Sequence, residues 1–198
     1  MARALTGYRR RSAVVLGLPR GGVPVAAEVA EALVLPLDVL VVRKLGVPGH
    51  EELAMGAVAG GGALFLNRPV IDGLGISARE VDSVVERERA VLARRLHDLT
   101  GGRPSPVVTG KTVLVVDDGL ATGSTMRAAV GALRALGPEE VVVAAPVGSP
   151  AACAALAAEA DDVVCLHQPA QFRAVGEWYA DFRPTTDDEV RRLLAGRP

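Results

Sequence analysis

The chain has 198 residues, of which 49% are hydrophobic and 3% aromatic, and its formal net charge is −1. This length suits one domain, the balanced charge does not favour nucleic acid or membrane surfaces, and no apolar run approaches the ~20 residues of a membrane span. We therefore predict a single cytoplasmic domain over residues 1–198, in which Cys153 and Cys165 are reduced core residues.

The first part of the chain predicts a parallel strand–helix–strand unit. Residues 1–12 are polar and rich in arginine, and we expect little regular structure there. Apolar runs at Ala13–Leu18 and Leu37–Val42 predict two buried strands, with a helix over Val23–Leu33 between them. A connection of this length is typical of a right-handed βαβ unit.

A glycine-rich hairpin is predicted next. Turn residues predict a loop over Gly46–Glu52. Three glycines at 60–62 separate the apolar stretches Ala54–Ala59 and Ala63–Asn67, as in an antiparallel hairpin. We expect this hairpin at the edge of the sheet, where it contributes one antiparallel strand.

A long amphipathic helix follows over residues 77–99. Ser77 and Glu80 form a capping box at its start, and its Glu/Arg-rich face is expected to be solvated. Thr100–Gly110, rich in glycine and proline, is predicted to be a mobile loop. Helix and loop together form an insertion over about residues 68–110.

The second half of the chain continues the alternation of strands and helices. Strands are predicted at Val113–Val116, Val141–Val147 and Val163–Leu166, and helices near Ser124–Leu136 and Pro150–Ala160. The whole order predicts an α/β fold: a doubly wound, mostly parallel sheet with an antiparallel edge strand and helices on both faces.

Residues Val113–Thr125 carry the strongest functional signal. The buried strand ends in two acids, Asp117 and Asp118, which lead into the small residues Ala121–Thr125 at the start of a helix. Backbone N–H groups and a helix dipole favour phosphate there, whereas paired carboxylates suit sugar hydroxyls or a divalent cation. The stretch predicts a sugar-phosphate site. The alternative, an Asx-type turn with a helix cap, leaves the small residues unexplained.

A second loop is expected to face these acids. In doubly wound sheets, ligands bind beyond the carboxyl ends of strands, where the winding reverses. If the first strand and the strand before the acids are neighbours, Arg20, Gly21 and Gly22 lie opposite the acids, and Arg20 can bind a second anion. Arg43 and Lys44 follow the next strand on the same rim. Two anion sites favour a sugar with a phosphate and a diphosphate, although the two glycines alone could simply form a tight turn.

These motifs resemble those of a known family. Val113–Thr125 resembles the phosphoribosyl-diphosphate signature of type I phosphoribosyltransferases. Leu18–Gly22 is similar to the diphosphate loop of that family, and Val42–Lys44 to its second loop. A bacterial subfamily of phosphoribosyltransferases with unassigned acceptor resembles the chain over three longer segments: Gly17–Glu28, Val41–Ala59 and Gly119–Arg127.

The resemblance implies roles for the matching residues. Asp117 and Asp118 would contact the ribose hydroxyls either by direct hydrogen bonds or through a Mg²⁺ ion. The two carboxylates would bind this ion directly or through water. Arg20 would hold the diphosphate, and its bond to Pro19 matches a position that is often a cis peptide. The remaining donor-binding residues implied are Gly21, Gly22, Arg43 and Lys44 for the diphosphate and Ala121, Thr122, Gly123, Ser124 and Thr125 for the 5′-phosphate.

The implied reaction displaces diphosphate from C1 of phosphoribosyl diphosphate by a nitrogenous acceptor, with Mg²⁺ as Lewis acid and with Asp117, Asp118 and Arg20 as the catalytic residues. Ala121 departs from the hypoxanthine/guanine enzymes, which carry an acid there, and Gly119 replaces a bulky aliphatic residue. The acceptor therefore stays open.

The acceptor site of the family is closed by a hood, which we expect here from the termini and the insertion. Residues 168–198 would form its C-terminal part and end in a short helix with a Thr186–Glu189 capping box. Its aromatic residues either stack on a base or attach the tail to the sheet, and we favour attachment. They are Phe172, Trp178, Tyr179 and Phe182.

Two functional hypotheses remain from the sequence. One is an enzyme of nucleotide metabolism that uses phosphoribosyl diphosphate and a small nitrogenous acceptor, without nucleic-acid or membrane partners. The other is a non-catalytic regulatory protein that binds phosphoribosyl diphosphate or a nucleotide. The cationic and acidic site residues favour the enzyme. The sequence leaves the oligomeric state open, with a homodimer considered, and it contains neither a P-loop nor a Gly-x-Ser-x-Gly motif.

Overall fold

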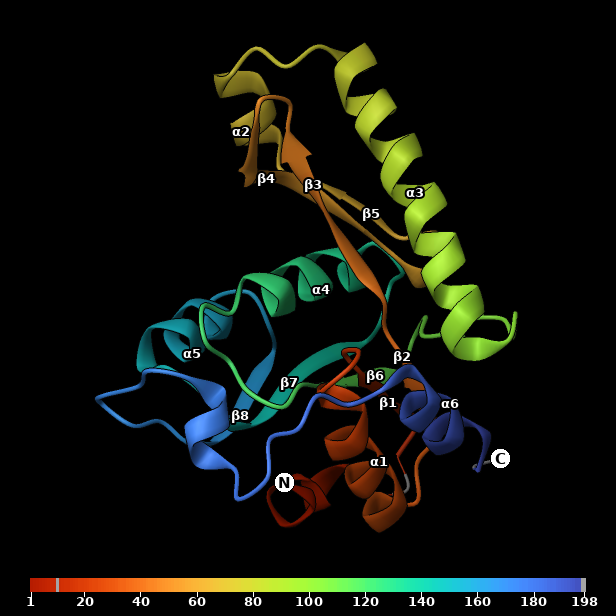
Figure 1. Cartoon of the computed structure of the whole chain (residues 1–198), viewed down its shortest axis with the longest axis vertical. Helices are drawn as coiled ribbons and strands as arrows, with labels where there is room; N and C mark the ends of the chain where they lie inside the picture. Colours follow the sequence, from red (N-terminus) through yellow and green to blue (C-terminus); the bar gives the residue numbers. More distant parts are fainter. Residues whose placement is uncertain (10, 197–198) are drawn as a thin grey trace.

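A five-stranded parallel sheet forms the centre of the computed structural model, which describes residues 1–9 and 11–196 (Figure 1). The strand order is β2-β1-β6-β7-β8, and each neighbouring pair is parallel. β1 and β6 are neighbours, as the sequence led us to expect. The strands are β1 (Ala13–Gly17), β2 (Leu37–Val39), β6 (Thr112–Val116), β7 (Glu140–Val147) and β8 (Asp162–His167).

Helices cover both faces of this sheet. One face packs against η1 (Ala2–Tyr8), α1 (Gly22–Leu33) and α6 (Asp187–Ala195), and the other against α4 (Ser124–Arg134) and α5 (Pro150–Ala157). Alternate residues of β6 supply the two cores: Leu114 contributes to the first, whereas Val113 and Val115 contribute to the second. Each fully buried aliphatic side chain stabilises the fold by about 1.5–3 kcal/mol. The predicted α/β class with layers on both faces is confirmed.

The antiparallel strands form a small sheet of their own, in the order β3-β4-β5. They are β3 (Val42–Val47), β4 (His50–Ala59) and β5 (Leu64–Leu66), with the glycine turn η2 (Gly60–Gly62) between the last two. The predicted glycine hairpin is confirmed, but it does not lie at the edge of the main sheet. This sheet instead packs between α3 and α4 (Figure 1).

The predicted loop over Gly46–Glu52 was wrong. β3 runs to Val47, which pairs with His50, so that only a tight turn remains. Gly49 makes this turn with a φ of 77°, a conformation that favours glycine.

The insertion continues through α2 (Arg68–Gly73) into α3 (Ala78–Thr100). The capping box of Ser77 and Glu80 is present as predicted, since each residue bonds the backbone N–H of the other.

The face of α3 opposite the apolar stripe is solvated as predicted, since Asp82, Glu86 and Arg94 are exposed. Two charged residues, however, lie within the apolar stripe itself, because they follow Val81 at the spacing of two and four helical turns. Glu88 is buried, and the Arg95 side chain is only 31% exposed. Both side chains pair with arginine or aspartate from other elements.

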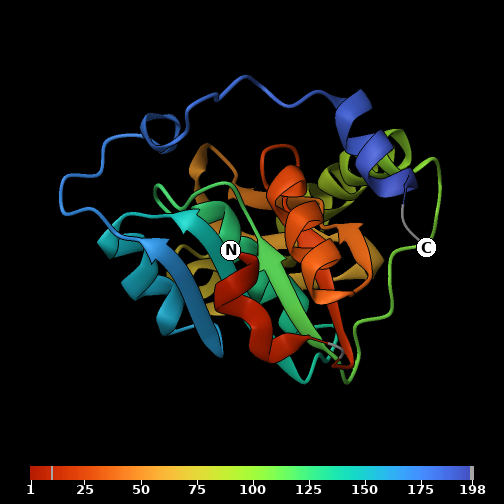
Figure 2. The same ribbon diagram turned by 90° about the horizontal axis from the view of Figure 1, so that it is seen from below.

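The N-terminal segment and the C-terminal tail close the fold. Residues 2–8, for which we predicted little structure, form the 3₁₀ helix η1, because Leu5 is fully buried in the core. After β8 the tail passes through η3 (Val175–Trp178) and crosses the molecule to α6, whose Thr186–Glu189 capping box is present as predicted (Figure 2). Both cysteines are free. No helix in the described ranges has the length and apolar character to span a membrane.

Candidate active site

The loops that follow β1 and β6 are in direct contact. Gly17 and Val116 are register partners, and the Leu18 N–H donates to the Val116 carbonyl at 2.9 Å. A Cβ on Gly21 would overlap the Asp118 carboxylate and come within 2.6 Å of its Cγ. A Cβ on Gly22 would lie 2.8 Å from the Asp117 Cα. The two glycines are therefore required by the close approach of the loops, which a simple tight turn does not explain.

The two carboxyls at the end of β6 are strongly perturbed. Burial, and then the neighbouring Asp118 charge, raise the pKa of Asp117 to about 7. Burial also raises the pKa of Asp118. The Asp118 N–H donates to Asp117 Oδ1 at 2.9 Å, which holds the first carboxyl in place. Such a pair gains from a cation or from hydroxyl donors, since both stabilise the ionised form.

The small-residue run after the acids forms an open loop at the start of α4. Gly123 has a φ of 71° and turns the chain into the helix, and the Ser124 N–H donates to Thr122 Oγ1 at 3.3 Å. The Ser149 hydroxyl, which the sequence did not single out, donates to the Ala121 carbonyl at 2.7 Å. Ala121, Thr122, Ser124 and Thr125 are exposed. The first turn of α4 can therefore receive an anion from solvent.

Adjacent residues of β3 point to opposite sides, as the pleat of a strand requires. Arg43 faces α3, where it bonds Glu88 at 2.8 and 3.0 Å. It also lines a pocket of about 240 Å³ together with Pro19 and Thr125. This pocket brings residues from all three predicted motifs together.

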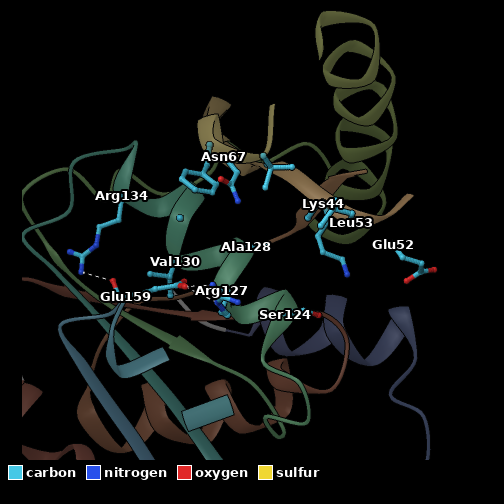
Figure 3. Close-up of a pocket in the computed structure, with 15 residues that line it drawn as sticks. Lys44, Glu52, Leu53, Asn67, Ser124, Arg127, Ala128, Val130, Arg134 and Glu159 are labelled. Carbon is cyan, nitrogen blue, oxygen red and sulfur yellow. Dashed lines mark hydrogen bonds and ion pairs between the residues drawn. The ribbon is translucent and has the colours of Figure 1, made fainter. Parts of the chain in front are cut away.

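Lys44 points into a different cleft, of about 650 Å³, between the small sheet and α4 (Figure 3). Ser124 of α4 lines the cleft near Lys44, and Arg127 lies farther along it beside Glu159. Phe65 of β5 also lines the cleft. The structure therefore separates the two basic residues that the sequence placed on one rim. Lys44 approaches the Ala121–Thr125 loop from the side opposite to Arg43.

The C-terminal tail packs on the acid loop. The Tyr179 hydroxyl donates to the Asp118 carbonyl at 2.6 Å, and burial raises the pKa of this phenol to about 12. The Val175 methyl groups lie 2.6 Å from the position of a Cβ on Gly119, so this glycine makes room for the tail. Tyr179 attaches the tail, whereas Trp178 and Phe182 remain 43% and 47% exposed.

Besides Ser149, three charged residues near the site were not singled out from the sequence. Arg95 lines the pocket that contains Arg43, and its guanidinium bonds the Asp187 carboxylate, while Glu88 holds Arg43. Glu88 and Arg95 lie on the apolar stripe of α3, together with Val81 and Leu92. The available signal was therefore the presence of two charged residues at positions of this stripe.

Comparison with known proteins agrees with this geometry. Residues 2–181 match the family described as the phosphoribosyl transferase domain. The chain belongs to this family. The resemblance drawn from its motifs is thereby confirmed, and the residues described above lie within the matched region, except for Asp187 in α6.

Individual phosphoribosyl transferase relatives match most of the chain. Proteins from two strains of Mycobacterium tuberculosis (CDC 1551 / Oshkosh and H37Rv), provisionally named as phosphoribosyl transferases, are 48% identical to it over 194 residues. The match covers 98% of this chain but 44% of theirs, so the chain spans less than half the length of these relatives. The crystal structure of TT1426 from Thermus thermophilus is similar with a TM-score of 0.90 at 43% identity, covering 99% of this chain and 93% of that one.

Proposed function

We propose that this family member transfers 5-phosphoribose from phosphoribosyl diphosphate to a nitrogenous base or a related amine and releases diphosphate. The contact between the Arg20–Gly22 loop and the Asp117–Asp118 pair, beside the open loop Ala121–Thr125, carries the proposal. An anion site at Ala121–Thr125, a pair of hydroxyl acceptors at Asp117 and Asp118, and a second anion site at Arg20 then lie side by side. This order matches a sugar that carries phosphate at one end and diphosphate at the other.

The proposed donor contacts follow from these positions. The backbone N–H groups and hydroxyls of Ala121–Thr125 bind the 5′-phosphate at the positive end of α4. Asp117 and Asp118 accept hydrogen bonds from the ribose hydroxyls, and Arg20 holds the diphosphate with Arg43. Lys44 adds positive charge from the cleft side. We also propose that residues 1–198 act as one domain, with residues 168–198 as the hood over the acceptor.

A magnesium ion fits this donor set. Among the described residues, no group of three or more His, Cys, Asp or Glu side chains could hold a metal alone. Mg²⁺ in phosphate-handling sites is commonly held by one or two carboxylates together with substrate phosphates, which is what Asp117 and Asp118 offer. When bound, Mg²⁺ would act as a Lewis acid that stabilises charge on the diphosphate oxygens.

The chain itself contributes position and charge to the reaction. The bond from C1 to the diphosphate oxygen breaks, a bond from C1 to the acceptor nitrogen forms on the opposite face, and the nitrogen loses its proton to water or to the released diphosphate. Fixing the ribose through Asp117 and Asp118 and the phosphate through the α4 loop holds C1 in place, which lowers the entropic part of the barrier. Arg20 stabilises the charge that develops on the departing diphosphate.

The test measures donor binding and diphosphate release with Mg²⁺ across a panel of purines, pyrimidines and other amines. The double variant Asp117→Asn, Asp118→Asn is expected to lose donor binding by calorimetry, whereas Asp72→Asn, an exposed carboxylate on α2, is expected to bind normally. Unchanged affinity in the double variant contradicts the site. Tight binding without turnover by any acceptor favours the non-catalytic regulatory protein instead.

A further inference from the structure

The Asp187 carboxylate lies between two arginines that come from distant parts of the chain. Arg95 of α3 bonds it with both nitrogens of its fork, at 2.5 and 2.8 Å. Arg20, from the proposed diphosphate loop, approaches the same carboxylate at 3.9 Å. Asp187 opens the first turn of α6, which packs against α3 (Figure 1). The Asp187 carboxylate thus lies where the guanidinium groups of Arg95 and Arg20 come together.

Arg95 also belongs to the pocket in which the three motifs meet. It lines the cavity of about 240 Å³ together with Pro19, Arg43 and Thr125. Arg43 in the same pocket is already paired with Glu88, whose side chain is only 11% exposed. An anion that enters this pocket therefore meets the Arg95 guanidinium. The counter-ion of Arg95 is Asp187, which belongs to the short C-terminal helix α6.

We propose that Arg95 is a further diphosphate-binding residue and that Asp187 is its internal counter-ion, which the diphosphate group of the donor displaces. The inference rests on the proposed function, since it extends the diphosphate end of the same site. It assigns the insertion a part in donor binding, because α3 carries Arg95. It assigns α6 a part as well, because the ligand competes with a carboxylate that helps to dock this helix on α3.

The chemistry of the two arginines supports an exchange of partners. A guanidinium fork matches a carboxylate and a phosphate group equally well in geometry, and a diphosphate offers more charge and more acceptor atoms. The side chains of Arg95 and Asp187 are 31% and 32% exposed. Ion pairs that retain this much contact with water contribute little, so Asp187 opposes ligand binding by no more than about fivefold.

The experiment measures the affinity of the full chain for inorganic diphosphate with Mg²⁺, and for phosphoribosyl diphosphate, by titration calorimetry. Arg95→Ala is expected to weaken diphosphate binding about tenfold, as for a lost charge-assisted bond, and Arg95→Lys to recover part of it. Asp187→Asn is expected to strengthen binding about two- to fivefold. Arg94→Ala, an exposed neighbour on α3, and Asp188→Asn, in the same turn of α6, are the matched controls and are expected to bind like wild type.

The opposite signs separate this proposal from a purely structural role. If the pair only docks α6, both variants break the same contact, and their effects on binding have the same sign or are absent; either result overturns the proposal. A wild-type protein that binds neither ligand contradicts the proposed function itself. A wild-type protein that binds both, with Arg95→Ala binding equally well, contradicts this inference alone.

Discussion

Replacing Asp117 by Asn is expected to stabilise the ligand-free protein at pH 8 although it removes a proposed ligand-binding group. Burial and the Asp118 charge raise the pKa of Asp117 from 3.8 to about 7 in the folded protein. Between these values the folded chain binds more protons than the unfolded chain, so its stability falls as the pH rises from about 4 to about 7. The penalty is absent below the unfolded pKa and complete above the folded one.

The size of this effect follows from the pKa change. Each pKa unit corresponds to about 1.36 kcal/mol, so a rise from 3.8 to about 7 corresponds to about 4 kcal/mol. Because Asp117 keeps partial contact with solvent, we expect about half of this, roughly 2 kcal/mol. In a domain of this size, 2 kcal/mol raises Tm by about 4–8 °C. At pH 4.5 the gain should shrink to about 1–2 °C.

The assay is thermal and urea unfolding of wild type and Asp117→Asn, without ligand, at several pH values from 4.5 to 8. Asp161→Asn serves as a control of opposite sign. Arg134 and the Val141 N–H hold the pKa of Asp161 below its usual range, so that carboxyl contributes stability above the unfolded pKa that is lost as the pH falls. If Asp117→Asn is no more stable than wild type at pH 8, or if its gain does not vary with pH, the electrostatic account of the acid pair is wrong.

Two further predictions concern contacts of the acid loop. Gly21→Ala is expected to cost about 1–3 kcal/mol of stability and at least tenfold in donor affinity, because the added methyl overlaps the Asp118 carboxylate. Gly7→Ala is the control, since no atom lies within 4 Å of the added Cβ. Normal donor binding by Gly21→Ala would contradict the contact. Tyr179→Phe is expected to lose about 1 kcal/mol in urea unfolding, since it removes the hydrogen bond to the Asp118 carbonyl, whereas unchanged stability would mean that the tail is held by other contacts.

The main sheet could be predicted from the sequence because its strands are marked by residues that are neighbours in the chain. Every residue of β1 and of β6 is buried, so the runs of valine and leucine mark the strands without further context. Asp117 and Asp118 interrupt such a run at its carboxyl end, where an α/β sheet places its ligands. Physical rules that act over a few residues were enough for these elements and for both capping boxes.

The small sheet and the charged contacts depend on partners far along the chain. Exposed residues are common in β3 and in the first half of β4, so these strands show no apolar alternation, and the Pro48–Gly49 turn alone gave the impression of a longer loop. Arg43 meets Glu88 across 45 positions, and Arg95 meets Asp187 across 92. Local spacing shows that Glu88 and Arg95 interrupt the apolar stripe of α3, but it does not show which distant residues pair with them.

The proposed acceptor side of the site depends on the tail in the same way. Gly119 lies next to Asp118 in the loop after β6, yet the reason for a glycine there comes from Val175, whose methyl groups lie 2.6 Å from the position of its missing Cβ. A bulky aliphatic residue at position 119 would push the tail from the acids and break the Tyr179 bond. The glycine at position 119 and the packing of the tail on the acid loop thus depend on each other. We therefore expect substitutions at Gly119 to act on the proposed acceptor side through the position of residues 175–179.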